Sequence, residues 1–318
     1  MKAVGVLCAR VRVEEKQIIA AVGVAGAAGM PVPPPSTPLP PGPASLDLAT
    51  LGIAQVSASA SEDVAIDSTL TALIDRCQNR TIAAISLPIL RASGITVLDA
   101  GLAADRNRLD VARVLATAGI ARPHTLIAFS EESGIEAARQ IGFPATLMPL
   151  TPGESGTTLH DEDTADAVIE HRVVLGTDSE AIVLIQHGAP AAHERTTIHV
   201  VAGKAIAHDG PGPDAAGIVL AEEAARAIDA SIVGIEIATV AGRQVVWDVQ
   251  PVAEFRQATL LGPESMAEAI AHAALSTNAT ARGTGFETAA IRSARADRIL
   301  SARWDAEQEA RHDVVLSA

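Results

Sequence analysis

A strand-like apolar run that leads directly into a glycine-rich loop most constrains how this chain can fold. The run 142–150 is followed at once by the loop 151–158, which contains Gly153, Ser155 and Gly156. Glycine tolerates positive φ angles, so successive backbone N–H groups of such a loop can turn inward around phosphate oxygens. We therefore expect a phosphate-binding loop between a buried strand and an acidic helix. An ordinary strand-to-helix loop is the alternative interpretation.

Apolar runs and helical patterns alternate along residues 1–100. Elements this short, in this order, are typical of a parallel sheet with helices on its faces. The proline cluster 31–44 can only form a loop or a polyproline stretch, because proline lacks a backbone donor. We predict a small α/β domain over residues 1–100. Its expected elements are strands at 1–8, 71–75 and 95–98 and helices at 13–28 and 82–93.

Residues 101–280 combine helices with two similar hairpins. The hairpins 198–207 and 237–247 each place an Ala-Gly-Lys/Arg turn between apolar runs, as antiparallel pairing requires. We expect a central region over 101–190, a second sheet domain over 191–280 and a helical extension or tail over 281–318. The other predicted elements are helices at 108–118, 164–172 and 217–230, a helix that begins at Ser130, and strands at 125–129, 146–150 and 181–186.

Composition limits the classes of partner. The net charge of -14 argues against a nucleic-acid partner, because a polyanion would be repelled. The uncharged stretch 17–46 is too short and too broken by proline to span a bilayer, and Arg10 and Arg12 interrupt any signal-peptide core. The sequence thus predicts a cytoplasmic protein. Cys8 and Cys77 lie in apolar runs, so buried free thiols are favoured over a disulfide.

Several segments resemble, in order, the LysX/RimK-like branch of the ATP-grasp ligases. The segment 10–16 is similar to the family's R-I-R-x-E-E-K start, and 108–123 is similar to a helix that begins with a nucleotide-contacting lysine. The segment 142–156 resembles G-[FY]-P-hhh-K-P-h-x-G-S-x-G, and Glu254-Phe255 resembles the family's E-F ending. The match covers roughly residues 1–275.

The resemblance implies an ATP-grasp fold, α/β and in part α+β, with a small N-terminal parallel-sheet domain, a central lid and a C-terminal sheet domain. It implies an ATP- and Mg-dependent carboxylate–amine ligase that works through an acyl phosphate, in amino-acid biosynthesis. The implied partners are an amine and a carboxylate that is either a small molecule or carried by a protein. A homo-oligomer is left open.

The resemblance also assigns site residues. Nucleotide contacts are expected from Arg108, Met148, Gly153, Ser155, Gly156 and Gln186, and metal contacts from Glu236, Asp248 and Gln250. Magnesium takes carboxylate and amide oxygens in octahedral geometry, which suits the second group. Alternation along hairpin strands could also expose Glu236 and Asp248 without any metal role. No catalytic residue is assigned.

The sequence departs from the family pattern at several of these positions. Met148 stands where the family has a lysine, His187 stands where it has an acidic residue, and Thr197 stands where it has an arginine. Met148 would also serve as a core gap-filler among its apolar neighbours. These departures lead to the alternative of a catalytically inactive ATP-grasp paralogue that acts as a binding or partner subunit. His193, His199 and His208 lack zinc-site spacing.

Overall fold

The computed structural model describes residues 3–32, 70–92, 95–177 and 181–280. The chain divides into one compact unit, residues 1–278, and a second unit, residues 279–318. Of the described residues, only 279 and 280 belong to the second unit. Most of the predicted proline cluster and the predicted tail fall outside the described residues. Within the described part, no helix is long and apolar enough to cross a membrane.

The N-terminal sheet is parallel throughout, as the alternation of elements predicted. Its strand order is β2-β1-β3-β4. The predicted helix 13–28 is shorter than expected, because the chain leaves it at Val24 and adds an edge strand that contains Pro31. Proline is tolerated there, since an edge strand does not need every donor. The elements are β1 (Ala3–Leu7), α1 (Val13–Val24), β2 (Ala28–Val32), β3 (Leu70–Asp75), α2 (Arg80–Ala92) and β4 (Thr96–Leu98).

The C-terminal sheet has the strand order β12-β11-β9-β10-β13, and its described neighbours pair antiparallel. Both predicted hairpins are confirmed. Each turn has two residues at positive φ, Ala202 and Gly203 in one and Ala241 and Gly242 in the other, as a type I′ turn requires. The elements are β9 (Thr196–Val201), β10 (Lys204–Asp209), α7 (Ala215–Ala227), β11 (Ile232–Val240), β12 (Arg243–Gln250), β13 (Thr259–Leu260) and α8 (Met266–Thr280).

A third sheet, of order β5-β8-β6-β7, carries the glycine-rich loop. The predicted direct passage from this loop to a helix is wrong. A short strand intervenes and pairs antiparallel with β6, so the loop connects two strands of a hairpin. Its β-branched threonines suit an edge strand. The elements are β5 (Thr125–Ala128), α5 (Glu131–Ile141), β6 (Ala145–Met148), β7 (Thr157–Leu159), α6 (Glu162–Leu175) and β8 (Val183–His187), followed by a 3-10 turn, Ala192–Glu194.

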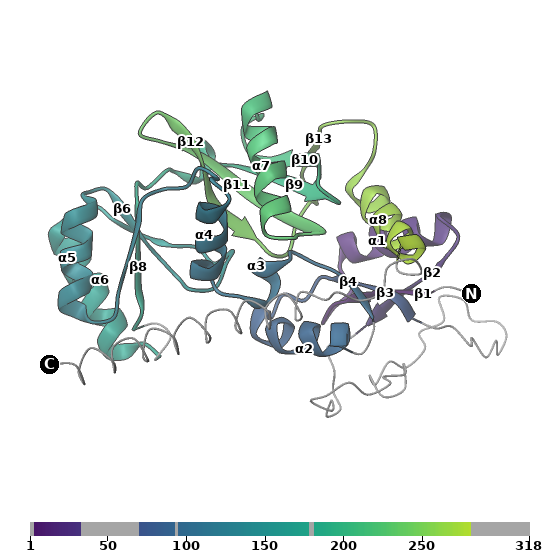
Figure 1. The fold of residues 1–318 in the computed structure, drawn as a ribbon, viewed down its shortest axis with the longest axis horizontal. Helices are drawn as coiled ribbons and strands as arrows, with labels where there is room; N and C mark the ends of the chain where they lie inside the picture. The colour runs from purple at the N-terminus through teal and green to yellow at the C-terminus, as the bar shows by residue number, and fades with distance from the viewer. Residues whose placement is uncertain (1–2, 33–69, 93–94, 178–180, 281–318) are drawn as a thin grey trace, which may run out of the picture. The chain divides into compact units, whose positions relative to one another are not determined.

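Three apolar clusters hold these sheets. Helices α5 and α6 pack on the third sheet through their own core (Figure 1). A second cluster joins β1, α1 and α8 to β10. The third joins the opposite side of the N-terminal sheet to α7 and the C-terminal sheet through α2, α3 (Leu102–Asp105) and α4 (Arg108–Thr117). Because β9 and β11 bury Ile198 and Ile235 in this cluster, their alternate residues face the other way.

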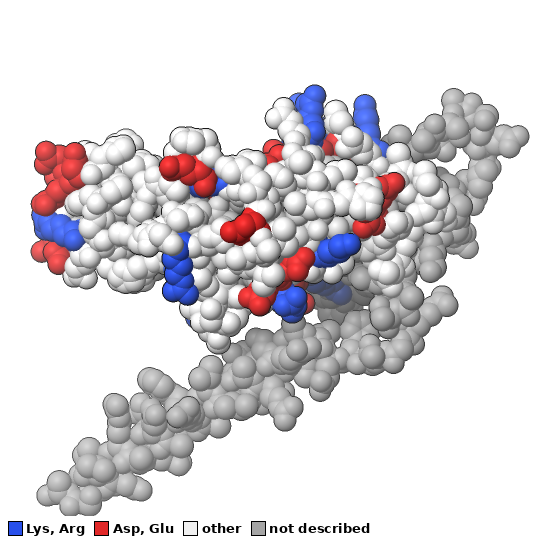
Figure 2. Space-filling model, turned by 90° about the horizontal axis from the view of Figure 1, so that it is seen from above, with Lys and Arg blue, Asp and Glu red and all other residues white. Residues whose placement is uncertain are grey.

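Charged side chains are sparse on the face seen in Figure 2, and both signs are interspersed there. At the end formed by α5 and α6, Arg139 pairs with Glu136 and Glu162. This face therefore carries no extended basic field of the kind that attracts nucleic acid.

Candidate functional site

A cleft of about 1090 Å³ lies between the N-terminal sheet domain and the C-terminal sheet. Its walls are the start of α2, the connection from α3 to α4, and the loop 150–154. The wall on the side of the C-terminal sheet is formed by Thr197, His199, Asp209 and Gln250. Ligand pockets for small molecules are commonly about 300–1,000 Å³, so the cleft has room for a sizeable ligand.

The glycine-rich loop is packed against protein on both of its sides. Gly153, at φ +82°, brings its backbone against Gln250, and its N–H donates to Asp248 Oδ2 at 3.2 Å. A Cβ added at Gly156 would lie 2.6 Å from Met148 Sδ, closer than real contacts allow. These glycines are therefore required by close packing of the loop against its surroundings. Ser155 is exposed on the same loop.

Arg108, the first residue of α4, is buried, and its donors are engaged by protein. Its Nε and Nη2 donate to the two carboxylate oxygens of Asp248 at 3.0 and 2.7 Å. Nη1 donates to the Pro149 carbonyl, and Nη2 also donates to the Glu154 carbonyl at 2.9 Å. A bidentate arginine–carboxylate pair is the strong form of this contact. The guanidinium thus ties the glycine-rich loop to β12.

Met148 ends β6 and is 2% exposed. Its sulfur lies beside Gly156, so it fills space under the loop. This placement matches the role of a core gap-filler, which its apolar neighbours also suggested. No cation replaces the family's lysine at this position.

Glu236 and Asp248 face each other across β11 and β12, the two strands of the second predicted hairpin. A register shift next to Glu236 leaves Trp247 as the extra residue, and such bulges re-aim neighbouring side chains. Arg195 Nη1 contacts Glu236 Oε1 at 2.8 Å. Burial raises the pKa of Glu236, and the charge of Asp248 acts in the same direction, against Arg195 and a hydrogen bond from Gln250.

Gln186 lies on β8, and its side-chain amide donates to the Trp247 carbonyl at 3.1 Å. It lines a second cavity together with Arg108, Leu184 and Asp248. This cavity has a volume of only about 30 Å³. A space of this size accommodates about one or two water molecules.

Comparisons with known proteins identify the fold. No family model matches the chain. A segment of 101 residues is 27% identical to the α-aminoadipate–LysW ligase LysX of Sulfolobus acidocaldarius and spans 31% of this chain and 37% of that protein. A RimK-domain ATP-grasp protein of Sphaerobacter thermophilus superposes with a TM-score of 0.67 at 26% identity, over 86% of this chain and 99% of that one.

The D-alanine–D-alanine ligase of Bacillus anthracis, solved with ATP, superposes with a TM-score of 0.60 at 15% identity, over 90% of this chain and 100% of that chain. The chain belongs to the ATP-grasp superfamily. Its parallel N-terminal sheet and two antiparallel sheets are the ATP-grasp architecture that the motifs predicted.

The ATP-grasp fold implies a bound nucleotide and magnesium, but the residues here do not fit that group. Both oxygens of Asp248 and one oxygen of Glu236 already accept from arginine. The cation slot of β6 holds the buried Met148, and the cavity beside Gln186 has a volume of only about 30 Å³. In the described part of the chain, no three His, Cys, Asp or Glu side chains are grouped as a metal site.

Sequence reasoning missed the residue that joins the two ends of the ATP-grasp region. Arg76 is 1% exposed, and its Nε contacts Glu15 at 3.0 Å. Its Nη1 donates to the Ala253 carbonyl, and its guanidinium lies 5.4 Å from the Phe255 ring centre. The family-like start of α1 and the E-F ending therefore meet at this arginine. Its position directly after a strand that ends in Asp75 was the only signal in the sequence.

Both cysteines are buried free thiols, as predicted. Cys8 directly follows β1, and Cys77 lies two residues beyond the end of β3, the strand that pairs with β1. Burial raises the pKa of the Cys8 thiol to about 11, and the charge of Glu15 acts in the same direction. A thiol with so little thiolate at neutral pH is a poor nucleophile.

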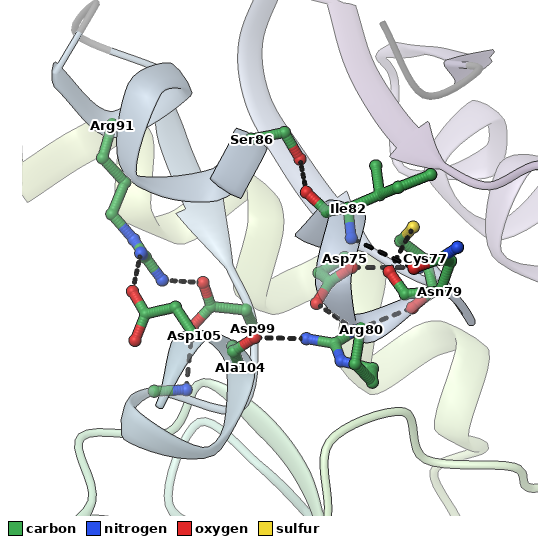
Figure 3. A network of polar contacts seen from close by, with 11 residues as sticks. Asp75, Cys77, Asn79, Arg80, Ile82, Ser86, Arg91, Asp99, Ala104 and Asp105 are labelled. Carbon is green, nitrogen blue, oxygen red and sulfur yellow. Dashed lines mark hydrogen bonds and ion pairs between the residues drawn. The ribbon is translucent and has the colours of Figure 1, made fainter. Parts of the chain in front are cut away.

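A second polar network supports the wall of the cleft (Figure 3). Arg80 lies between Asp75 and the Ala104 carbonyl, and Arg91 lies between Asp99 and Asp105. Burial raises the pKa of Asp99 to about 6, although the guanidinium of Arg91 acts in the opposite direction. Asp99 thus binds a proton in the folded protein at a pH where the unfolded chain has released it.

The raised pKa of Asp99 predicts a pH-dependent stability. The stabilisation that its protonated form provides is complete below the unfolded pKa of 3.8 and is lost as pH rises to about 6. Asp99→Asn removes this titration. The unfolding free energy of the wild type, relative to the variant, should fall by roughly 2 kcal/mol from pH 4 to pH 7. Urea titrations across this range measure the difference, and parallel pH profiles would contradict the assignment.

Proposed function

We propose that this protein is a non-catalytic ATP-grasp paralogue that binds a ligand in its cleft as a binding or partner subunit. The observation that carries this proposal is the bidentate pair of Arg108 with Asp248. The cation that donates to the Glu154 carbonyl of the glycine-rich loop is committed to the carboxylate that the resemblance assigned to a metal.

The size of the lost interactions supports a non-catalytic role. Phosphoryl transfer depends on fixed cations that stabilise the developing charge on the phosphate. By analogy with removal of an oxyanion donor, each lost contact slows the reaction about 10²–10³-fold. Losing the cations at Met148 and Thr197 would then cost about 10⁴–10⁶ in rate. Thr197 lines the cleft, but it supplies only a hydroxyl group there.

The ligand that we propose belongs to the family's substrate class. It is a carboxylate or an amine, either as a small molecule or on a carrier protein. The cleft of about 1090 Å³ is large enough for a peptide segment as well as for a small molecule. We further propose that the protein acts in the cytoplasm.

The second candidate function is an ATP- and Mg-dependent carboxylate–amine ligase of LysX/RimK type, acting through an acyl phosphate. The retention of Glu236 and Asp248 on adjacent strands, with Gln250 next along β12, favours this candidate. This activity would require Arg108 and Arg195 to release both carboxylates when the nucleotide binds.

Nucleotide binding separates the two candidates. A nucleotide present at 100 times its Kd stabilises the native state by about 2.7 kcal/mol, which a thermal melt resolves easily. We expect 10 mM ATP with magnesium to leave the melting temperature unchanged, and no ADP to form during incubation with mixed amino acids. A Mg-dependent rise in melting temperature together with ADP release would overturn the non-catalytic proposal in favour of the ligase.

A further inference from the structure

Two buried carboxylates lie directly opposite each other on the C-terminal sheet. Glu236 is 8% exposed, Asp248 is 7% exposed, and the two residues are register partners on β11 and β12. Like charges at opposed positions of an antiparallel pair repel each other, and buried charges must be compensated. Some cation must therefore neutralise this pair.

Two guanidinium groups from separate segments supply this compensation. Arg108 reaches Asp248 from the start of α4, and Arg195 reaches Glu236 from the residue before β9. The N–H of Gly153 adds a third donor to Asp248. Two carboxylates and two guanidinium groups sum to zero charge.

We propose that Arg108 and Arg195 are permanent counter-ions of this acidic pair and that they replace a divalent metal at the site. A divalent ion would either displace a guanidinium or place a net charge of +2 in a buried, neutral cluster. Magnesium also requires near-octahedral oxygen coordination, whereas three of the four carboxylate oxygens here already accept protein donors. This inference goes beyond the proposed function, because it concerns the metal and not the ligand of the cleft.

Arg195 is the residue that decides whether a metal can bind. Arg108 is also fixed by two backbone carbonyls, whereas Glu236 is the only ion-pair partner of Arg195 among the residues that the structure describes. The Arg195 side chain is 28% exposed, so its removal opens Glu236 towards solvent without emptying a core position. Glu236 Oε1 and the Gln250 amide oxygen would then be available to a hard cation.

The test is a titration with Mn²⁺, a paramagnetic ion that shares the preference of magnesium for oxygen ligands. Mn²⁺ binding is measured by electron paramagnetic resonance in 0.1 M salt. Only the binding that is lost in the Glu236→Gln variant is counted as binding at this site. We expect none in the wild type up to 1 mM. Arg195→Ser should gain one site, at least tenfold tighter than any wild-type binding. The matched control Arg195→Lys keeps the positive charge and should behave as the wild type does.

Two results would overturn the inference. One is a wild-type site for Mn²⁺ that Glu236→Gln removes. The other is an Arg195→Ser variant that melts cooperatively and still binds no Mn²⁺. If Arg195→Ser does not fold, the comparison of the wild type with Glu236→Gln decides alone. Because the titration contains no nucleotide, its outcome is independent of the ATP experiment that tests the proposed function.

Discussion

Replacing Arg108 by methionine is expected to lower the free energy of unfolding by about 3–5 kcal/mol. The substitution leaves Asp248, which is 7% exposed, without the cation that contacts both of its oxygens. It also frees the Pro149 and Glu154 carbonyls that hold the glycine-rich loop. Urea unfolding at neutral pH measures the change. The effect should greatly exceed that of an exposed ion pair on the same helix.

The matched control is Arg113→Met, also on α4. Arg113 contacts Asp110 at 3.7 Å and is 74% exposed, so its removal should cost less than about 1 kcal/mol. A second control is the double variant Arg108→Met with Asp248→Leu. It removes both charges and should recover most of the stability, because a buried ion pair is often replaceable by apolar residues. Equal costs for Arg108→Met and Arg113→Met would contradict this account of the loop.

The local parts of the fold could be predicted because local signals determine them. The hairpins follow from short turns whose glycines, Gly203 and Gly242, accept positive φ, and the parallel sheet follows from alternating strands and helices. The three-residue strand β7 could not be predicted, since Thr157–Leu159 is too short to show a period. The helix α8 was also missed. Its alanine-rich sequence has a weak amphipathic pattern.

The hairpin that carries Glu236 and Asp248 was predictable from the sequence, but the contacts of the candidate site residues were not. In the structure Glu236 lies opposite Asp248, and the glycine-rich loop lies against Gln250. The pairing of Arg108 with Asp248 joins residues 140 positions apart, and no periodicity reports such a contact. The contact of Arg195 with Glu236 likewise joins residues far apart in the sequence, and the family pattern places an arginine at Thr197 instead. Long-range ion pairs depend on how the domains pack, which local sequence does not specify.

Met148→Lys is expected to destabilise the protein by several kcal/mol without improving ATP binding. Met148 is 2% exposed and lies beneath Gly156, so an ammonium group there would be desolvated. The volume-conserving control Met148→Leu should cost less than about 1.5 kcal/mol. Melting curves and calorimetric ATP titrations on both variants provide the measurement.

The opposite outcome has a definite meaning for the ATP-grasp site. If Met148 occupied a lost phosphate clamp, the lysine stem would lie along β6 and its ammonium would extend towards the loop. Stability would then change little, and ATP affinity would rise at least tenfold, equivalent to about 1.4 kcal/mol. Adding Thr197→Arg should raise the affinity further under that hypothesis. If the loop instead packs against Met148 as in the structure, Thr197→Arg should not raise ATP affinity, because no phosphate then reaches the new charge.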